Sequence, residues 1–353
     1  MAHEQPGPQG SRPGPTPKPS ADADARPEPV RIPPEHLAAA AARLVSGNAA
    51  PDLASGRRFL RAAPDHGIDL SMFWGLPHPA GGSIEPYDPV VLAVPAPGRT
   101  AMLFLSEPRR LAGVPAPSDA DADLARTLDR VCRDLAGVER EGGISVAQAL
   151  PELGHTWARA GLLGAGFIHV GDLAYLACAS PPSGWAAPAQ PLPEGLRVRT
   201  AEAIAREQSP TEADRRLIEA LDASYVGTLD CPELCGLRDS ADILDSHRAT
   251  GEHDPSLWRL VERDDGATAV CLFSLSNEGR DGELVYLGLS PELRGQGLGG
   301  WLLDQGLADI ASRGCRRALC AVDLRNAPAL SIYGKRGFHE TSRRGAFVRR
   351  ITP

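Results

Sequence analysis

The amino-acid sequence predicts an α/β fold with a mixed sheet, built in two halves that a proline-rich linker separates. β-rich segments alternate with helical ones along the chain, which is typical of α/β proteins. In the second half, three β-rich segments follow one another through short turns, which indicates antiparallel neighbours. Two later β-rich segments enclose a helix-length segment, which suits a parallel crossover. A chain of 353 residues is also longer than one ordinary domain and suits two.

Composition narrows the classes of partner. Hydrophobic residues make up 42% of the chain, so we expect sizeable cores and a globular protein. The net charge of −8 argues against a nucleic-acid partner or a membrane surface. The charge is uneven: residues 281–353 hold 11 Lys and Arg against 7 Asp and Glu, which gives +4 there and −12 over the rest. A basic region on an acidic protein suits a small phosphorylated ligand. The oligomeric state is left open.

The cysteines indicate a reducing compartment. There are seven, they are scattered, and the sequence shows neither a secretory leader nor a run of about 18 apolar residues, so we expect a cytoplasmic protein. The spacings Cys231 to Cys235 and Cys315 to Cys320 differ from those of the usual zinc ribbons. We therefore expect no metal and interpret these residues as small buried thiols.

Composition also divides the chain into four parts. Residues 1–34 are rich in Pro, Gly, Ala, Asp and Glu and nearly free of large apolar side chains, which predicts a disordered tail. Residues 35–180 form a first domain. Residues 181–195 contain five prolines and form a linker. Residues 196–353 form a second domain.

Hydrophobic periodicity and turn residues place the elements of the first domain. Helices are predicted at residues 35–45, 53–63, 121–135 and 156–164. Strands are predicted at residues 89–94 and 100–105, as a hairpin, and at 144–150 and 168–178.

The second domain begins with a predicted strand at residues 196–200. Helices follow at residues 212–224 and 240–249, and then antiparallel strands at 257–262, 267–275 and 283–289. The final part predicts a helix at 298–312, a strand at 318–322, a helix at 327–335, and closing strands near 338 and at 346–351.

A glycine-rich loop gives the strongest chemical signal. Residues 290–300 read SPELRGQGLGG and join a predicted strand to a predicted helix. Glycines let backbone N–H groups approach a ligand closely, and the helix start adds partial positive charge, so the loop suits a pyrophosphate. Gly295, Gly297 and Gly300 also satisfy the dinucleotide pattern G-x-G-x-x-G, with Asp323 closing the next strand. That interpretation is weaker, because residues 291–294 separate the strand from the glycines and only about 50 residues remain after the loop.

A second pair of patterns is more specific. Arg294, Gly297 and Gly299 match R-x-x-G-x-G. The pattern N-x-x-A-x-x-x-Y-x-x-x-G-F follows, matched by Asn326, Ala329, Tyr333, Gly337 and Phe338. With both patterns in order on the expected elements, about residues 196–350 resemble the GNAT superfamily of acyl-coenzyme-A-dependent N-acyltransferases.

The resemblance implies acetyl-coenzyme A as acyl donor and assigns cofactor contacts. The pyrophosphate would bind backbone amides of the loop, which comprises Arg294, Gly295, Gln296, Gly297, Leu298, Gly299 and Gly300. The pantetheine arm would pair with the main chain around Leu287 and Leu289, where the strands at 283–289 and 318–322 would splay apart. Asn326 would contact the cofactor beside the thioester.

The resemblance also assigns the catalytic groups. Tyr333 would protonate the leaving thiolate, although a core tyrosine packed on Phe338 is the alternative. Glu283 would act as general base through water, although it could equally be a solvated residue at a strand start. The other candidates for the base are Asp230, Glu233 and His247.

The acceptor is expected over the first two helices of the second domain and their loop, residues 224–236. This segment is polar, and Tyr225, Asp230 and Glu233 are its candidate substrate-binding residues. We expect a small-molecule amine there.

The first domain resembles a degenerate copy of the second. Gly166 and Phe167 parallel Gly337 and Phe338, but residues 107–115 contain no glycine cradle and the asparagine and tyrosine positions are missing. The whole is similar to tandem GNAT proteins of the mycothiol synthase type, with the C-terminal copy complete and the N-terminal copy without coenzyme A. An unrelated α/β structure is the alternative for the first domain.

The sequence therefore predicts a cytoplasmic enzyme that moves an acetyl group from acetyl-coenzyme A to a primary amine by direct attack. Two alternatives stay open at this point: a non-catalytic acyl-coenzyme-A sensor and a protein N-acetyltransferase.

Overall fold

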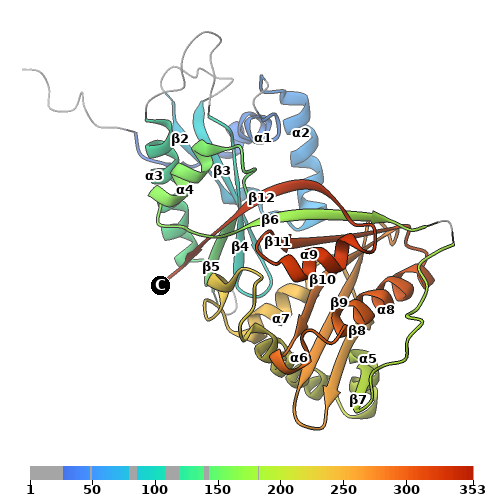
Figure 1. Cartoon of the computed structure of the whole chain (residues 1–353). Helices are drawn as coiled ribbons and strands as arrows, with labels where there is room; N and C mark the ends of the chain where they lie inside the picture. Colours follow the sequence, from blue (N-terminus) through green and yellow to red (C-terminus); the bar gives the residue numbers. More distant parts are fainter. Residues whose placement is uncertain are drawn as a thin grey trace, which may run out of the picture.

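One sheet of 12 strands runs through the protein, in the order β1-β2-β3-β4-β5-β12-β6-β11-β10-β9-β8-β7 (Figure 1). The computed structural model describes residues 27–47, 50–78, 86–108, 119–138, 143–181 and 183–352. Most neighbours in the sheet are antiparallel, while β4–β5 and β10–β11 are parallel. The expected mixed-sheet α/β fold is confirmed.

The first half of the chain supplies strands β1 to β6. These are β1 (Val30–Arg31), β2 (Phe73–Pro77), β3 (Tyr87–Ala96), β4 (Thr100–Leu105), β5 (Val146–Ala149) and β6 (Ile168–Ala179). Its α-helices are α1 (Leu37–Val45), α2 (Leu53–Ala62), α3 (Ala120–Ala136) and α4 (Thr156–Gly164).

The second half begins with β7 (Leu196–Thr200). Its other strands are β8 (Glu252–Arg263), β9 (Thr268–Ser276), β10 (Asp281–Leu289), β11 (Arg317–Asp323) and β12 (His339–Arg350). Its α-helices are α5 (Ala201–Glu207), α6 (Pro210–Tyr225), α7 (Ser240–Arg248), α8 (Leu298–Ser312) and α9 (Ala327–Gly334). Local chemistry sets the start of α6, where Ser209 Oγ accepts a hydrogen bond from Glu212 N and Pro210 occupies the first helical position.

The two halves repeat one pattern of elements. In each, an antiparallel pair of strands leads to a helix, a parallel strand, a second helix and a long last strand. β4 and β5 pair in parallel over residues 100–102 and 146–148, as β10 and β11 do over residues 281–284 and 317–320. The protein is therefore a tandem of related folds.

The last strands of the two halves exchange places. β6 pairs with β11 of the second half, β12 pairs with β5 of the first half, and β6 and β12 pair with each other (Figure 1). The two halves consequently share one sheet, and the first half forms part of the framework beside β11. The domain boundaries near residues 180 and 196 remain a prediction.

Helices cover both faces of the second half. α8 and α9 pack on one face, where Phe273, Leu284, Leu302 and Tyr333 lie in the same buried cluster. α5, α6 and α7 pack on the other face around Trp258. A separate cluster forms the core of the first half.

Several expectations need correction. The predicted tail included Val30 and Arg31, but these pair with β2, and Ile32 is buried in the first core; residues 1–26 lie outside the described residues. The strands expected near 338 and at 346–351 are one strand, β12. β2 and α5 were not predicted. Most of the loop expected at 107–115 lies outside the described residues.

Within the described part of the chain, no helix combines the length and apolarity needed to cross a membrane. The seven cysteines are all unpaired thiols, of which Cys235 is exposed.

Candidate active site

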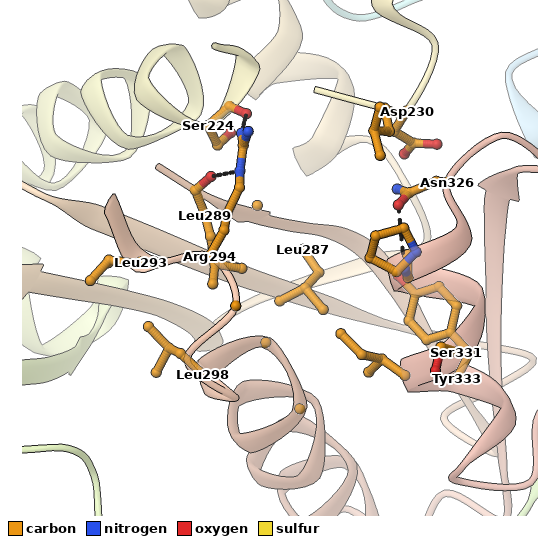
Figure 2. A pocket seen from close by; sticks show the side chains of 18 of the residues that line it. Ser224, Asp230, Leu287, Leu289, Leu293, Arg294, Leu298, Asn326, Ser331 and Tyr333 are labelled. Atoms are coloured by element: carbon orange, nitrogen blue, oxygen red, sulfur yellow. Dashed lines mark hydrogen bonds between the residues drawn. The ribbon is translucent and has the colours of Figure 1, made fainter. Parts of the chain in front are cut away.

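The site lies where β10 and β11 separate. Their parallel pairing ends at Leu284 and Cys320, although β10 continues to Leu289 and β11 to Asp323. A cavity of about 660 Å³ occupies this opening, bounded by β10, the start of α8, α9 and the segment after α6 (Figure 2). The main chain of β10 beyond Leu284 is thus left without a partner strand on the β11 side, as the predicted splay requires.

The glycine-rich loop forms one end of the cavity. Gly295 and Gly297 have φ angles of +74° and +80°, a left-handed conformation that favours glycine, and a Cβ at either would meet no atom within 4 Å. Glycine is therefore needed there for the backbone shape. α8 begins directly afterwards with no side-chain cap, so its first N–H groups remain available to an anion.

The side chain of Arg294 has a structural role. Its guanidinium donates hydrogen bonds to three carbonyl oxygens, at 3.0 Å to Leu289 and Gly227 and at 2.9 Å to Ser224 (Figure 2). It thus ties the end of β10 to the segment that follows α6. These three bonds engage the guanidinium within the protein.

Two further cations line the cavity just after α9. Arg336 pairs with Asp304 and donates to the carbonyl of Gly300 at 2.8 Å. Lys335 is exposed, and it is the one lysine among the described residues. The end of the cavity beside the glycine-rich loop therefore carries positive charge.

Asn326 stands at the other end of α9. Its Oδ1 accepts a hydrogen bond from Ala329 N at 3.3 Å and so caps the helix. The side chain also lines the cavity, as Asp230 does (Figure 2). The cap fixes the orientation of the amide that faces the cavity.

Tyr333 is buried in the cavity wall with 5% of its surface exposed. Its ring packs on Phe338 at a centroid distance of 5.7 Å, so it also contributes to the core. Burial, and next the nearby Cys320 thiol and Asp230 carboxyl, raise the pKa of the Tyr333 hydroxyl well above its usual value. The Tyr333 hydroxyl is therefore protonated at neutral pH.

Asp230 supplies the carboxylate of the cavity wall. Among the described lining residues it is the one acid. Its Oδ1 accepts a hydrogen bond from Asp323 N at 2.8 Å. Asp230 is exposed, and partial desolvation of its carboxyl raises its pKa.

Charged residues outside the wall hold this segment in place. The buried carboxylate of Asp323 accepts a hydrogen bond from Cys231 N at 3.1 Å and pairs with Arg325. Arg325 also pairs with Glu233 at 2.6 Å and donates to the carbonyl of Val170, on β6 of the first half, at 2.6 Å. Arg325 lowers the pKa of Glu233. Glu233 thus anchors the segment instead of facing the cavity.

Tyr286 is a wall residue that sequence reasoning missed. Its hydroxyl lies 2.7 Å from Ser224 Oγ, which donates in turn to the carbonyl of Leu221. A Cβ on Gly288 would lie 2.5 Å from the Tyr286 ring, so glycine at 288 makes room for it. The sequence does contain a signal for this residue: Tyr286 and Gly288 lie two residues apart on one strand, so their side chains share a face and the glycine leaves space for the ring. His247, the histidine considered as base, stacks behind Tyr286 at 5.4 Å, and burial lowers its pKa to about 4.

The structure brings together most of the predicted site. The wall contains Asp230, Leu287, Leu289, Arg294, Gly295, Gly297, Leu298, Gly299, Gly300, Asn326 and Tyr333. Four predicted residues are not in it: Glu283, Gln296, Tyr225 and Glu233.

Of the four residues outside the wall, Glu233 pairs with Arg325 as described above, and the other three each have a different environment. Gln296 donates to the carbonyl of Glu292 at 2.7 Å, and Tyr225 packs edge-on against Tyr286. Glu283 lies on the part of β10 that still pairs with β11, and burial raises its pKa.

The sequence of the part that forms the cavity is similar to known acetyltransferases. Residues 221–338 match the sequence model of the Acetyltransferase (GNAT) family. The chain is 32% identical over 160 residues to the mycothiol acetyltransferase of Streptomyces bingchenggensis and 33% identical over 153 residues to that of Beutenbergia cavernae. These alignments cover 45% and 42% of this chain and 47% of each relative, so the chain spans about half the length of the curated relatives it matches.

A solved structure extends the likeness of fold to nearly the whole chain. The crystal structure of a GCN5-related N-acetyltransferase from Sphaerobacter thermophilus superposes with a TM-score of 0.57 at 21% identity. It covers 92% of this chain and 96% of its own.

Proposed function

We propose that this chain, whose C-terminal half contains a GNAT domain, is an N-acetyltransferase that moves an acetyl group from acetyl-coenzyme A to a primary amine of a small molecule. The observation that carries the proposal is the cavity at the splayed strands, which joins an anion-binding loop at one end to Tyr333 and Asp230 at the other. A phosphorylated thioester carries negative charge and a protonated amine carries positive charge. The loop and Lys335 offer positive charge for the first, and Asp230 offers negative charge for the second.

The residues present fit coenzyme A as the donor substrate. The left-handed loop and the uncapped start of α8 supply N–H donors for the pyrophosphate, and Lys335 adds positive charge. The unpaired main chain at Leu287 and Leu289 offers hydrogen bonds to the amides of the pantetheine arm. No metal is required by this chemistry, because the oxyanion can be stabilised by backbone N–H groups.

The reaction is a direct attack. The neutral amine nitrogen attacks the thioester carbonyl, a C–N bond forms, and the C–S bond breaks to release a thiolate. Tyr333 gives its proton to the thiolate. Glu283 accepts, through water, the proton that the ammonium group loses to become the attacking neutral amine, and burial raises the pKa of Glu283 above its usual value. The second nitrogen proton, lost after the C–N bond forms, returns to the Tyr333 oxygen through water, and Glu283 releases its proton to solvent. Asp230 binds the incoming ammonium group.

Thiol release measured against a panel of primary amines tests the proposal. We expect release that depends on both acetyl-coenzyme A and an amine, with an acetylated product detected by mass spectrometry. Binding of acetyl-coenzyme A by calorimetry without thiol release for any amine would contradict it and leave an acyl-coenzyme-A sensor. Release with peptides alone would indicate a protein acetyltransferase.

A further inference from the structure

The polar side chains of the segment that follows α6 bond to the protein itself, although Asp230 and Glu233 are exposed. Thr228 Oγ1 accepts a hydrogen bond from Asp230 N at 3.1 Å, Asp230 bonds Asp323, and Glu233 bonds Arg325. Cys231 is buried. The sequence suggested a polar surface here, but these polar groups are engaged by the protein itself.

The apolar side chains of the same segment face outward. Val226, Leu229 and Leu234 are 60%, 50% and 40% exposed. Among the described residues from 196 onward, these three are the large hydrophobic side chains that remain exposed. Single exposed hydrophobic residues are ordinary, but three on one nine-residue segment indicate a binding surface.

One of these three exposed side chains also lines the cavity. Leu229 belongs both to the exposed set and to the cavity wall, and the next residue is Asp230, the carboxylate of that wall. An amine held at Asp230 and directed at the thioester therefore has its remaining atoms beside Leu229. The segment, drawn in yellow between α6 and α7, lies against the exchanged strands (Figure 1).

We infer that the acceptor is a primary amine that carries an apolar group of several carbons, which packs on Val226, Leu229 and Leu234 while its ammonium group pairs with Asp230. This inference rests on the proposed function and names its acceptor class. An acceptor built mainly of hydroxyl groups, such as an amino sugar, would leave these three side chains without a matching surface.

A series of straight-chain amines from propylamine to hexylamine tests it, with glucosamine as the polar comparison. Burying a methylene contributes about 0.8 kcal/mol, so kcat/KM should rise about twofold to fourfold per added methylene. Glucosamine should be a poorer acceptor than hexylamine. A flat series, or a preference for glucosamine, would overturn the inference while leaving acetyl transfer intact.

Variants identify the surface. Val226→Ser, Leu229→Ser and Leu234→Ser together should remove most of the dependence on chain length. Val45→Ser with Leu163→Ser is the matched control, because these side chains are 43% and 46% exposed in the first half, and it should retain the dependence. Equal behaviour of the two variants would overturn the inference.

Binding separates this inference from the proposed function. Hexylamine titrated into the protein saturated with coenzyme A should bind about tenfold or more tightly than propylamine, whether or not turnover occurs. Absent turnover would refute the proposed function alone, whereas equal affinities would refute the acceptor class. Sedimentation that shows a dimer for the natural protein and a monomer for the triple variant would mean that a second copy covers the surface, which also overturns the inference.

Discussion

The backbone N–H of Asp323 holds the carboxylate of Asp230 at 2.8 Å, so the end of β11 fixes the one acid that the described cavity wall contains. Asp323 is itself held by Arg325, which reaches β6 of the first half through the carbonyl of Val170. The position of the carboxylate therefore depends on contacts that cross from one half of the protein to the other.

Arg325→Met should raise the KM for the amine without weakening acetyl-coenzyme A. Loss of the guanidinium frees Glu233 and the segment that carries Asp230, and a small displacement of a positioned group costs about tenfold to hundredfold. Steady-state kinetics and calorimetry measure the two effects. Arg325→Lys should restore the amine KM only in part, because a lysine ammonium cannot make the paired hydrogen bonds that the planar guanidinium makes to two carboxylates.

Arg343→Met is the matched control, because Arg343 is similarly exposed and pairs with Glu340, three residues away on the same strand. An equal rise in KM in both variants, or a loss of coenzyme-A affinity in Arg325→Met, would mean that Arg325 has a general structural role.

Gly297→Glu should abolish binding of acetyl-coenzyme A. The left-handed backbone costs a non-glycine residue about 1–2 kcal/mol, and the carboxylate would repel the phosphates. Gly266→Glu is the control, because Gly266 also has a positive φ angle of +90° with no atom within 4 Å of a Cβ, yet lies in the turn between β8 and β9. Calorimetry should show lost affinity for the first variant alone. Retained affinity in Gly297→Glu would refute the loop assignment.

Glu283→Gln and Glu233→Gln should change stability with opposite signs. Burial raises the pKa of Glu283, so its charge destabilises the fold above that pKa, and Glu283→Gln should raise Tm at about pH 8 with the gain fading as the pH falls toward about 4. Arg325 lowers the pKa of Glu233, so this pair stabilises the fold until the pH falls through the lowered value. Glu233→Gln should lower Tm at about pH 8, with no difference in strong acid.

Thermal melts from about pH 8 down to strong acid measure both changes in Tm. Glu283→Gln should also lower kcat if Glu283 accepts the proton. Full activity in that variant would transfer the role of base to Asp230.

The sequence predicted the second half more completely than the first, for physical reasons. α8 was predicted at its observed bounds because a glycine loop precedes it and a helical apolar pattern continues through it. The exchange of β6 and β12 could not be predicted, since strand pairing between distant segments leaves no local pattern. The residue types of Tyr225 and Glu233 predict substrate contacts, and that stays a prediction. The contacts that place both outside the cavity wall are with Tyr286 and Arg325, which are distant in sequence and leave no local pattern. Residues 226–234 form an irregular segment, in which exposed and buried side chains follow no fixed period. The exposure of its apolar side chains therefore could not be predicted from the sequence either.

Tyr333→Phe should reduce kcat while leaving the affinity for acetyl-coenzyme A nearly unchanged. Phenylalanine keeps the packing on Phe338, so the variant removes only the hydroxyl. Burial raises the pKa of that hydroxyl, which keeps it protonated until a thiolate forms beside it. A general acid contributes about 10²–10⁴-fold, or roughly 3–5 kcal/mol of barrier, and kcat should fall on that scale. Tyr87→Phe is the control, because it also removes a tyrosine hydroxyl, one bonded to His36 in the first half, and it should leave kcat unchanged. A fall in cofactor affinity with kcat intact would make Tyr333 a binding residue. No change in either would leave it a core tyrosine, with the thiolate protonated by solvent.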